Sequence, residues 1–160
     1  MEYIKLFTVL GQYKVKYLIC GGLAVNIYGI PRMTADIDLL LDFKEDNIKN
    51  FEIALKLLLY KNTIPISLNN FVNKEEREKV IKNKNLIAYS YYNSNSGFMS
   101  LDVLLDVPLE FDDLWKRKTV KESNGTSMNI VNIKDLITLK EYSNRLQDQN
   151  DVLLLSKLLK

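Results

Sequence analysis

The sequence predicts an α+β (α/β) fold, in which helices pack on a mixed β-sheet of about five strands. Two patterns indicate it: short segments where apolar residues alternate with polar ones, and longer segments with apolar residues at helical spacing. With 160 residues, 47% of them hydrophobic, the chain is long enough to bury one hydrophobic core. We therefore expect a single domain over 1–160, with C-terminal helices from about 133 packed on it.

Helices and strands are predicted to alternate in the first half of the chain. Gly21-Gly22 ends the first apolar strand, and Gly29 and Pro31 close the short helix that follows. Asn73 is a suitable N-cap for a charged helix. In order, we expect a helix over 4–14, a strand over 16–20, a helix over 23–28, a strand over 37–41, a helix over 46–60 and a helix over 73–82.

The second half is predicted to contribute more of the sheet. A polar loop over 93–97 joins two apolar segments into a hairpin, and Asn124-Gly125 between apolar segments is a strong two-residue hairpin signal. In order, we expect strands over 86–92 and 99–107, a helical turn over 111–116, strands over 118–122 and 127–133, and helices over 133–142 and 145–160.

The composition excludes several classes of chemistry. The chain has no histidine, which removes Ser-His-Asp and Cys-His catalysis and all His-ligated metals. Its single cysteine, Cys20, excludes an intrachain disulfide and a multi-thiolate metal site. Twenty-two basic against twenty acidic residues give no basic excess of the kind that nucleic-acid or anionic-membrane binding usually needs.

The location expected from the sequence is the cytoplasm, without a membrane partner. The N-terminal residues lack the basic flank and apolar stretch of a secretory signal. No apolar run approaches the ~18–20 residues of a membrane-spanning helix.

Asp36 and Asp38 are the first candidate site residues. Residues two apart in a strand point the same way, so these carboxylates lie side by side, roughly 7 Å apart at Cα. The two negative charges repel each other, which makes the folded state less stable, and a bound divalent cation removes this repulsion. All-oxygen ligands suit Mg²⁺ or Mn²⁺. The alternative is a solvated strand edge that carries two polar residues.

Asp102 and the glycine pair are the other candidates. Asp102 is a lone carboxylate in an otherwise apolar strand and needs a partner, which is a metal, an arginine or the strand end. Asp106 shares its face but lies about 13 Å away, so we interpret it as a strand-end or turn residue. Gly21-Gly22 lets backbone N–H groups approach a phosphate, although such a pair is more often a simple turn.

Taken together, these segments resemble a known family. Gly21-Gly22, then Arg32-x-Thr34-x-Asp36-x-Asp38, then a distant Leu101-Asp102-Val103 resemble the signature of the DNA polymerase β nucleotidyltransferase superfamily. The small bacterial members are the most similar, namely the AbiEii-type (minimal) toxin nucleotidyltransferases and the lincosamide- and kanamycin-modifying enzymes. The resemblance covers about 17–151. Many members have Gly-Ser in place of Gly-Gly, so the serine hydroxyl that would contact phosphate is missing here.

The resemblance implies an enzyme that moves a nucleoside monophosphate from an NTP to a hydroxyl group of a tRNA, a protein or a small drug. Asp36 and Asp38 would hold two divalent ions, Mg²⁺ or Mn²⁺. Asp102 would complete the site of the ion that activates the acceptor hydroxyl.

Phosphate binding is assigned by the same resemblance. Gly21 and Gly22 would cradle the triphosphate through backbone N–H groups. Arg32 and Thr34 would add a cation and a hydroxyl, although Arg32 could equally pair with a carboxylate of the fold.

The C-terminal segment also resembles these relatives, which end in a Leu-Lys helix followed by Arg-x-x-Asp-x-x-Asp. Lys140 would then reach the triphosphate, the alternative being a surface lysine on an amphipathic helix. Arg145 and Asp148 are spaced to pair on a helix, and Asp151 belongs to the same structural set.

The motifs favour a toxin–antitoxin-type nucleotidyltransferase with a cognate toxin or antitoxin partner. One alternative is an antibiotic nucleotidyltransferase of the lincosamide or aminoglycoside kind. Another is a non-catalytic nucleotide-binding interaction module. The presence of all three carboxylates argues against the module, because an unneutralised cluster only costs stability.

Overall fold

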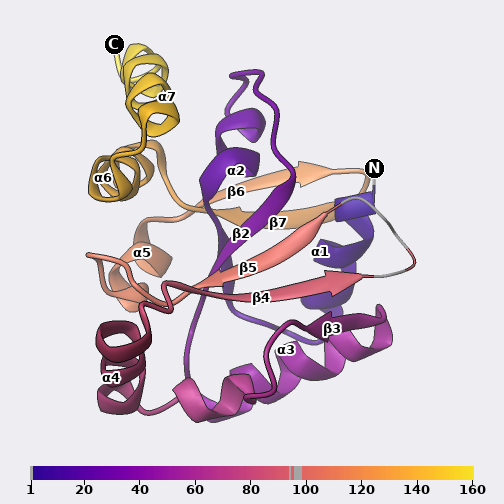
Figure 1. Ribbon diagram of the computed structural model, residues 1–160. Coiled ribbons are helices and arrows are strands. Elements are labelled where there is room, and N and C mark those ends of the chain that lie inside the picture. The colour runs from indigo at the N-terminus through magenta and orange to yellow at the C-terminus, as the bar shows by residue number, and fades with distance from the viewer. Residues whose placement is uncertain (1, 94, 96–98) are drawn as a thin grey trace.

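A computed structural model describes residues 2–93, 95 and 99–160 of the chain (Figure 1). Most of the predicted hairpin loop over 93–97 therefore lies outside the described residues. The helices are α1 (Glu2–Gln12), α2 (Gly21–Ile27), α3 (Glu45–Leu57), the 3₁₀ helix η1 (Leu68–Phe71), α4 (Lys74–Lys84), α5 (Phe111–Arg117), α6 (Ile133–Ser143) and α7 (Leu146–Lys157). The strands are β1 (Tyr17–Ile19), β2 (Asp36–Leu41), β3 (Tyr60–Asn62), β4 (Ala88–Asn93), β5 (Ser100–Leu104), β6 (Thr119–Ser123) and β7 (Thr126–Ile130).

The strands form one mixed sheet in the order β3-β4-β5-β2-β1-β7-β6. β2 and β5 run parallel at its centre, as do β1 and β7, and the other neighbouring pairs are antiparallel. The α+β fold class is confirmed, and the sheet has seven strands within the described residues rather than about five.

Helices α1 and α3, which lie together in Figure 1, pack apolar side chains against one face of this sheet, and the hydrophobic core also takes in buried side chains of α2, α5, α6 and α7. Phe7 of α1 stacks on Tyr17 of β1, with ring centroids 5.4 Å apart. Phe51 of α3 meets Tyr91 of β4 edge-on at 5.8 Å. Because side chains alternate along a strand, the residues between the core-facing ones point to the opposite face. That opposite face carries the candidate site.

Two local predictions are confirmed, a hairpin turn and a helix N-cap. Asn124 and Gly125 have φ angles of 50° and 74° and join β6 to β7, where Ser123 pairs with Thr126. The side chain of Asn73 accepts a hydrogen bond from the backbone N–H of Glu76 and caps α4.

The predicted helix over 46–60 is wrong at its C-terminal end. α3 ends at Leu57, and Leu59 adopts a φ of 64°, which reverses the chain into edge strand β3. Apolar spacing continues through Tyr60, so periodicity alone does not mark the stop. No helix of the described residues is both long and apolar enough to cross a membrane.

Candidate functional site

The two acidic strands lie next to each other at the centre of the sheet. β2 and β5 are parallel, and Asp38 is the direct register partner of Asp102. Directly opposed residues point to the same face, so the two carboxylates share one face of the sheet. Asp36 is opposite Ser100, whose Oγ donates a 2.5 Å hydrogen bond to Asp36 Oδ1. Carboxylates from two distant segments of the chain therefore meet on one surface.

Gly21 makes room for Asp38 at the start of α2. A Cβ atom at position 21 would lie 1.7 Å from Asp38 Oδ2, which no real contact allows. The residue also has a φ of +59°, in the left-handed region that favours glycine. The strands fix this approach, because the backbone N–H of Cys20 donates to the carbonyl of Asp38 at 3.0 Å. Glycine is thus required for both space and backbone conformation.

The electrostatic environment raises the pKa of Asp38. Burial is the largest cause, and the neighbouring carboxylates of Asp102 and Asp36 add to it. The ammonium of Lys140 and a hydrogen bond from the backbone N–H of Gly22 act in the opposite direction. Asp38 therefore stands in a site where its negative charge is costly and added positive charge is favourable.

These side chains fit a hard divalent cation by donor type, because every side-chain donor is a carboxylate or hydroxyl oxygen. Within 2–93, 95 and 99–160, no three acidic or thiol side chains are already gathered closely enough to hold one ion. Asp36 is engaged by Ser100, and Asp38 is turned toward Gly21 and Gly22. Ligation of one ion would need rotation of these side chains, while the backbone already presents them on one face.

Gly22 lies against the loop that leads into β2. A Cβ atom there would lie 2.7 Å from Thr34 Oγ1 and 3.1 Å from Arg32 Cζ. The hydroxyl of Thr34 donates to the carbonyl of Asp36 at 3.1 Å. The backbone N–H of Arg32 donates to Asn26 Oδ1 at 2.8 Å. The structure therefore brings Gly22, Arg32 and Thr34 together at one border of the acidic surface.

Lys140 is buried, not a surface lysine, with only 4% of its surface exposed. Its Nζ donates a hydrogen bond to Asp148 Oδ1 at 2.7 Å and forms an ion pair with Asp151 Oδ2 at 2.9 Å, so α6 is joined to α7. Asp151 also forms an ion pair with Arg32, which links α7 to the loop before β2. Asp148 accepts a further 2.8 Å hydrogen bond from Arg145 Nε. We call these five residues the C-terminal ion network.

The network departs from the sequence analysis in two respects, the burial of Lys140 and the role of Asp151, and agrees with it in two others. Both partners of the expected Arg145–Asp148 pair are found together, and Arg32 does pair with a carboxylate of the fold. The role of Asp151 as the bridge between Arg32 and Lys140 was missed, because the sequence does not show which loop faces α7. Ser100 was also missed as a partner of Asp36, although its position two residues before Asp102 places it on the same face.

Comparison with solved structures finds the same fold in nucleotidyltransferases. The lincosamide antibiotic adenylyltransferase LnuA, lincomycin-bound, aligns with a TM-score of 0.60 and 13% identity over 97% of this chain and 94% of that chain. ANT(2")-Ia, in complex with adenylyl-2"-tobramycin, aligns with a TM-score of 0.59 and 11% identity over 100% and 91%. An antigenic nucleotidyltransferase-like protein from Paracoccidioides brasiliensis aligns with a TM-score of 0.58 and 16% identity over 98% and 75%.

Sequence comparisons gave no match, either to protein-family models or to curated proteins. At these low identities the structural likeness establishes the nucleotidyltransferase fold. The activity has to be argued from the site.

Proposed function

We propose that this protein transfers a nucleoside monophosphate from an NTP to a hydroxyl group of an acceptor. The observation that carries the proposal is the register of the central strands, which sets Asp38 directly opposite Asp102 with Asp36 two residues away. The shared fold with nucleotidyltransferases supports the same reaction class.

In this proposal Asp36, Asp38 and Asp102 hold the divalent cations, two ions of Mg²⁺ or Mn²⁺. Such ions supply charge that stabilises the phosphoryl oxygens and lower the pKa of the acceptor hydroxyl. The carboxylates orient the ions, and Ser100 holds Asp36 until a cation competes for it. The raised pKa of Asp38 supports this role, because a site that disfavours bare negative charge gains from a cation.

The triphosphate is assigned to the border formed by Gly21, Gly22, Arg32 and Thr34. This assignment rests on the family resemblance and on the positive charge of Arg32 beside Gly22. The space that the missing Cβ atoms leave is taken by Asp38 at Gly21 and by Thr34 and Arg32 at Gly22. Lys140 is tied to two carboxylates, so we assign it the role of a fixed positive charge near Asp38. A direct contact from Lys140 to phosphate would require it to exchange one of these partners.

The acceptor is the least constrained part of the proposal. A toxin–antitoxin role, with tRNA or protein as acceptor and a cognate partner, rests on the resemblance of the Arg32–Asp38 motif and of the tail. An antibiotic acceptor is supported by LnuA and ANT(2")-Ia sharing the fold. The non-catalytic module is disfavoured by the shared face of the three carboxylates.

Calorimetric titration with each NTP, in Mg²⁺ and then in EDTA, tests the proposal. We expect binding that depends on the metal in the wild type and is lost in Asp38→Asn. The variant should melt at a higher temperature than the wild type in EDTA, because it removes a buried charge that is repelled by Asp102.

Glu75→Gln, an exposed carboxylate on α4, is the matched control and should bind NTP like the wild type. Equal NTP binding with and without metal, or full transfer activity in Asp38→Asn, would refute the assignment of the carboxylates.

A further inference from the structure

A cavity of about 370 Å³ lies between α3, β3 and the segment that leads into η1. Tyr91 of β4 lines this cavity and also packs edge-on against Phe51 of α3, so the cavity is on the α3 side of the sheet. The preceding residue, Ser90, points to the other face, where it is the register partner of Asp102. The cavity is therefore separate from the carboxylates of the candidate site, and we call it the rear pocket.

The Tyr91 hydroxyl is the only buried side-chain polar atom without a hydrogen-bond partner among the residues that the structure describes. Tyr91 is only 5% exposed, so bulk water does not readily replace the missing partner. The neighbouring hydroxyl of Tyr89 is already engaged, because it donates to the carbonyl of Ile66 and accepts from Asn62 Nδ2 at 3.1 Å. A buried hydroxyl without a partner makes the fold less stable, and a ligand in the rear pocket would supply that partner.

Two opposite charges line the rear pocket without pairing. Glu52 and Lys56 are four residues apart on α3 with the glutamate first, the order and spacing that favour an ion pair. Within the described part of the chain, neither the Glu52 carboxylate nor the Lys56 ammonium forms an ion pair or a hydrogen bond. Glu52 is half-buried, and its charge raises the pKa of Tyr91 in addition to the larger effects of burial and of Tyr89. The rear pocket thus presents an acid, a base and a neutral hydroxyl.

The rest of the wall is apolar apart from a few polar groups. Leu55, Pro65 and Ile66 supply apolar surface. Ser67 Oγ accepts a hydrogen bond from the backbone N–H of Asn69 at 3.2 Å, which leaves its own hydrogen available for a ligand. Apolar walls with a small number of placed polar groups are typical of sites for small molecules, and the volume lies at the lower end of their range.

We propose that the rear pocket binds a zwitterionic α-amino acid with an aliphatic side chain. The ammonium group of the ligand pairs with Glu52, its carboxylate with Lys56 and the Ser67 hydroxyl, and the Tyr91 hydroxyl bonds to its polar end. A simple carboxylate would lie beside Glu52, and a simple amine beside Lys56, so each would meet like charge. One water molecule, which fills roughly 30 Å³ in the liquid, would partner Tyr91 alone and leave both charges unpaired.

Three matched compounds test the inference by calorimetric titration without nucleotide or metal. L-leucine carries both charges, 4-methylpentanoate lacks its ammonium, and 3-methylbutylamine lacks its carboxylate. We expect leucine to bind the wild type about tenfold more tightly than either of the others, because each charged hydrogen bond adds to affinity. No detectable binding of leucine, or equal binding of the three compounds, would overturn the inference. The titrations do not depend on the proposed function, since the rear pocket shares no residue with the candidate site.

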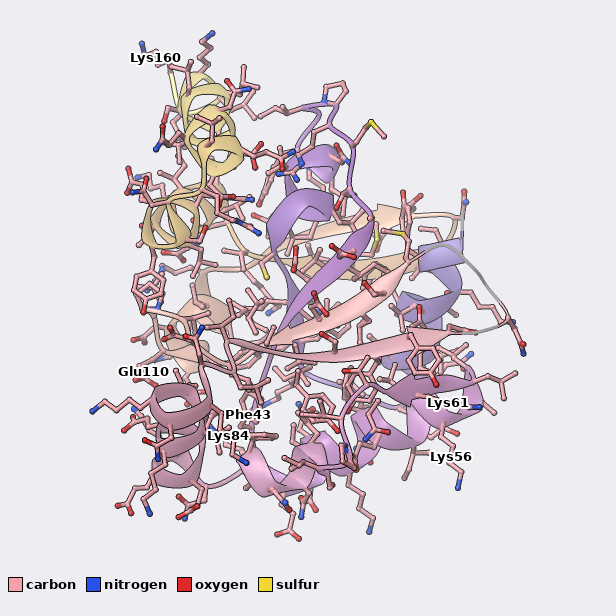
Figure 2. The ribbon with its side chains drawn as sticks, viewed as in Figure 1. Phe43, Lys56, Lys61, Lys84, Glu110 and Lys160 are labelled. Carbon is pink, nitrogen blue, oxygen red and sulfur yellow. The ribbon has the colours of Figure 1, made fainter. Side chains whose placement is uncertain are left out.

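Charge variants identify the groups that read the ligand. Glu52→Gln should remove the advantage of leucine over 4-methylpentanoate, and Lys56→Gln should remove its advantage over 3-methylbutylamine. The control is Lys61→Gln on the neighbouring β3; Figure 2 labels Lys56 and Lys61. Lys61 is exposed and lies between two lining residues of β3, so its side chain points to the other face and all three affinities should stay unchanged. Unaltered preferences in both pocket variants would contradict the assignment.

Two tyrosine variants test the hydroxyl itself. Tyr91→Phe keeps the ring against Phe51 and removes the unpartnered hydroxyl, so without ligand it should melt no lower than the wild type. Its affinity for leucine should fall about fivefold. Tyr89→Phe loses two hydrogen bonds and should melt lower than the wild type. If Tyr91→Phe melts as low as Tyr89→Phe, or binds leucine like the wild type, the Tyr91 hydroxyl does not serve a ligand and the inference fails.

Discussion

Comparing Gly21→Ala with Gly125→Ala separates two reasons for glycine at position 21, which are the space that Asp38 needs and the left-handed backbone conformation. Gly21 has a φ of +59°, and a Cβ there would lie 1.7 Å from Asp38 Oδ2. Gly125 has a φ of +74° with nothing within 4 Å of its Cβ position. Gly125→Ala therefore carries the conformational cost alone, and Gly21→Ala carries that cost together with a clash.

The two costs can be sized separately. A left-handed conformation costs an L residue about 1–2 kcal/mol. An added methyl group in a tightly packed site costs about 1–3 kcal/mol more, because a neighbour must move. We expect Gly125→Ala to lose about 1–2 kcal/mol and Gly21→Ala about 2–5 kcal/mol. For a chain of this size, the difference corresponds to a melting temperature lower by roughly 2–12 °C.

The alanine would displace the Asp38 carboxylate, so we expect the clash to weaken nucleotide binding as well as stability. We expect the affinity for NTP with Mg²⁺ to fall at least tenfold in Gly21→Ala, about 1.4 kcal/mol, and to be unchanged in Gly125→Ala. Thermal melts and calorimetry on both variants check this. If Gly21→Ala matches Gly125→Ala in stability and in NTP affinity, the close approach of Asp38 to the backbone has no functional meaning.

Two other predictions concern the C-terminal ion network. Asp151→Asn leaves Arg32 and Lys140 without a buried counter-charge, so it should lower the free energy of unfolding by about 3–5 kcal/mol and weaken NTP binding. The control Asp113→Asn breaks an exposed ion pair in α5 and should lower it by at most about 1 kcal/mol. Similar urea midpoints for the two variants would contradict this prediction. Burial raises the pKa of Asp148, but hydrogen bonds led by that from Arg145 outweigh it and hold the pKa well below its usual range. Its carboxylate therefore stabilises the fold above the unfolded pKa of about 3.9, and this contribution is lost as pH falls through the lowered folded value. Urea midpoints measured from ~pH 5 to ~pH 2 should fall further in wild type than in Asp148→Asn, and parallel profiles would rule out this linkage.

The sequence predicts the faces of the strands better than their neighbours. Apolar and polar residues alternate along β2 and β5, which places Asp36, Asp38 and Asp102 on the face opposite the apolar side chains of their strands, because the side-chain period of a strand is two. Whether β5 lies beside β2 depends on long-range pairing, and no local pattern encodes that. The prediction of three carboxylates on one surface needed the family resemblance, and the register in the structure agrees with it.

The missed features have local or long-range physical causes. β3 was missed because Leu59 adopts a positive φ without being glycine or asparagine, the residues that usually announce such a reversal. The burial of Lys140 was not predicted, because its two carboxylate partners lie on the next helix. The sequence analysis allowed for Arg32 to pair with a carboxylate, but it did not identify Asp151 as that carboxylate.

The ion pair between Arg32 and Asp151 joins positions 119 residues apart. At the usual ribosomal speed of about 5–20 residues per second, the arginine is made roughly 6–24 s before its counter-charge exists. Throughout that interval the growing polypeptide holds an arginine whose final partner has not been synthesised. The loop before β2 gains this ion pair only after α7 has been synthesised, so we expect the proposed nucleotide site to be completed at the end of translation.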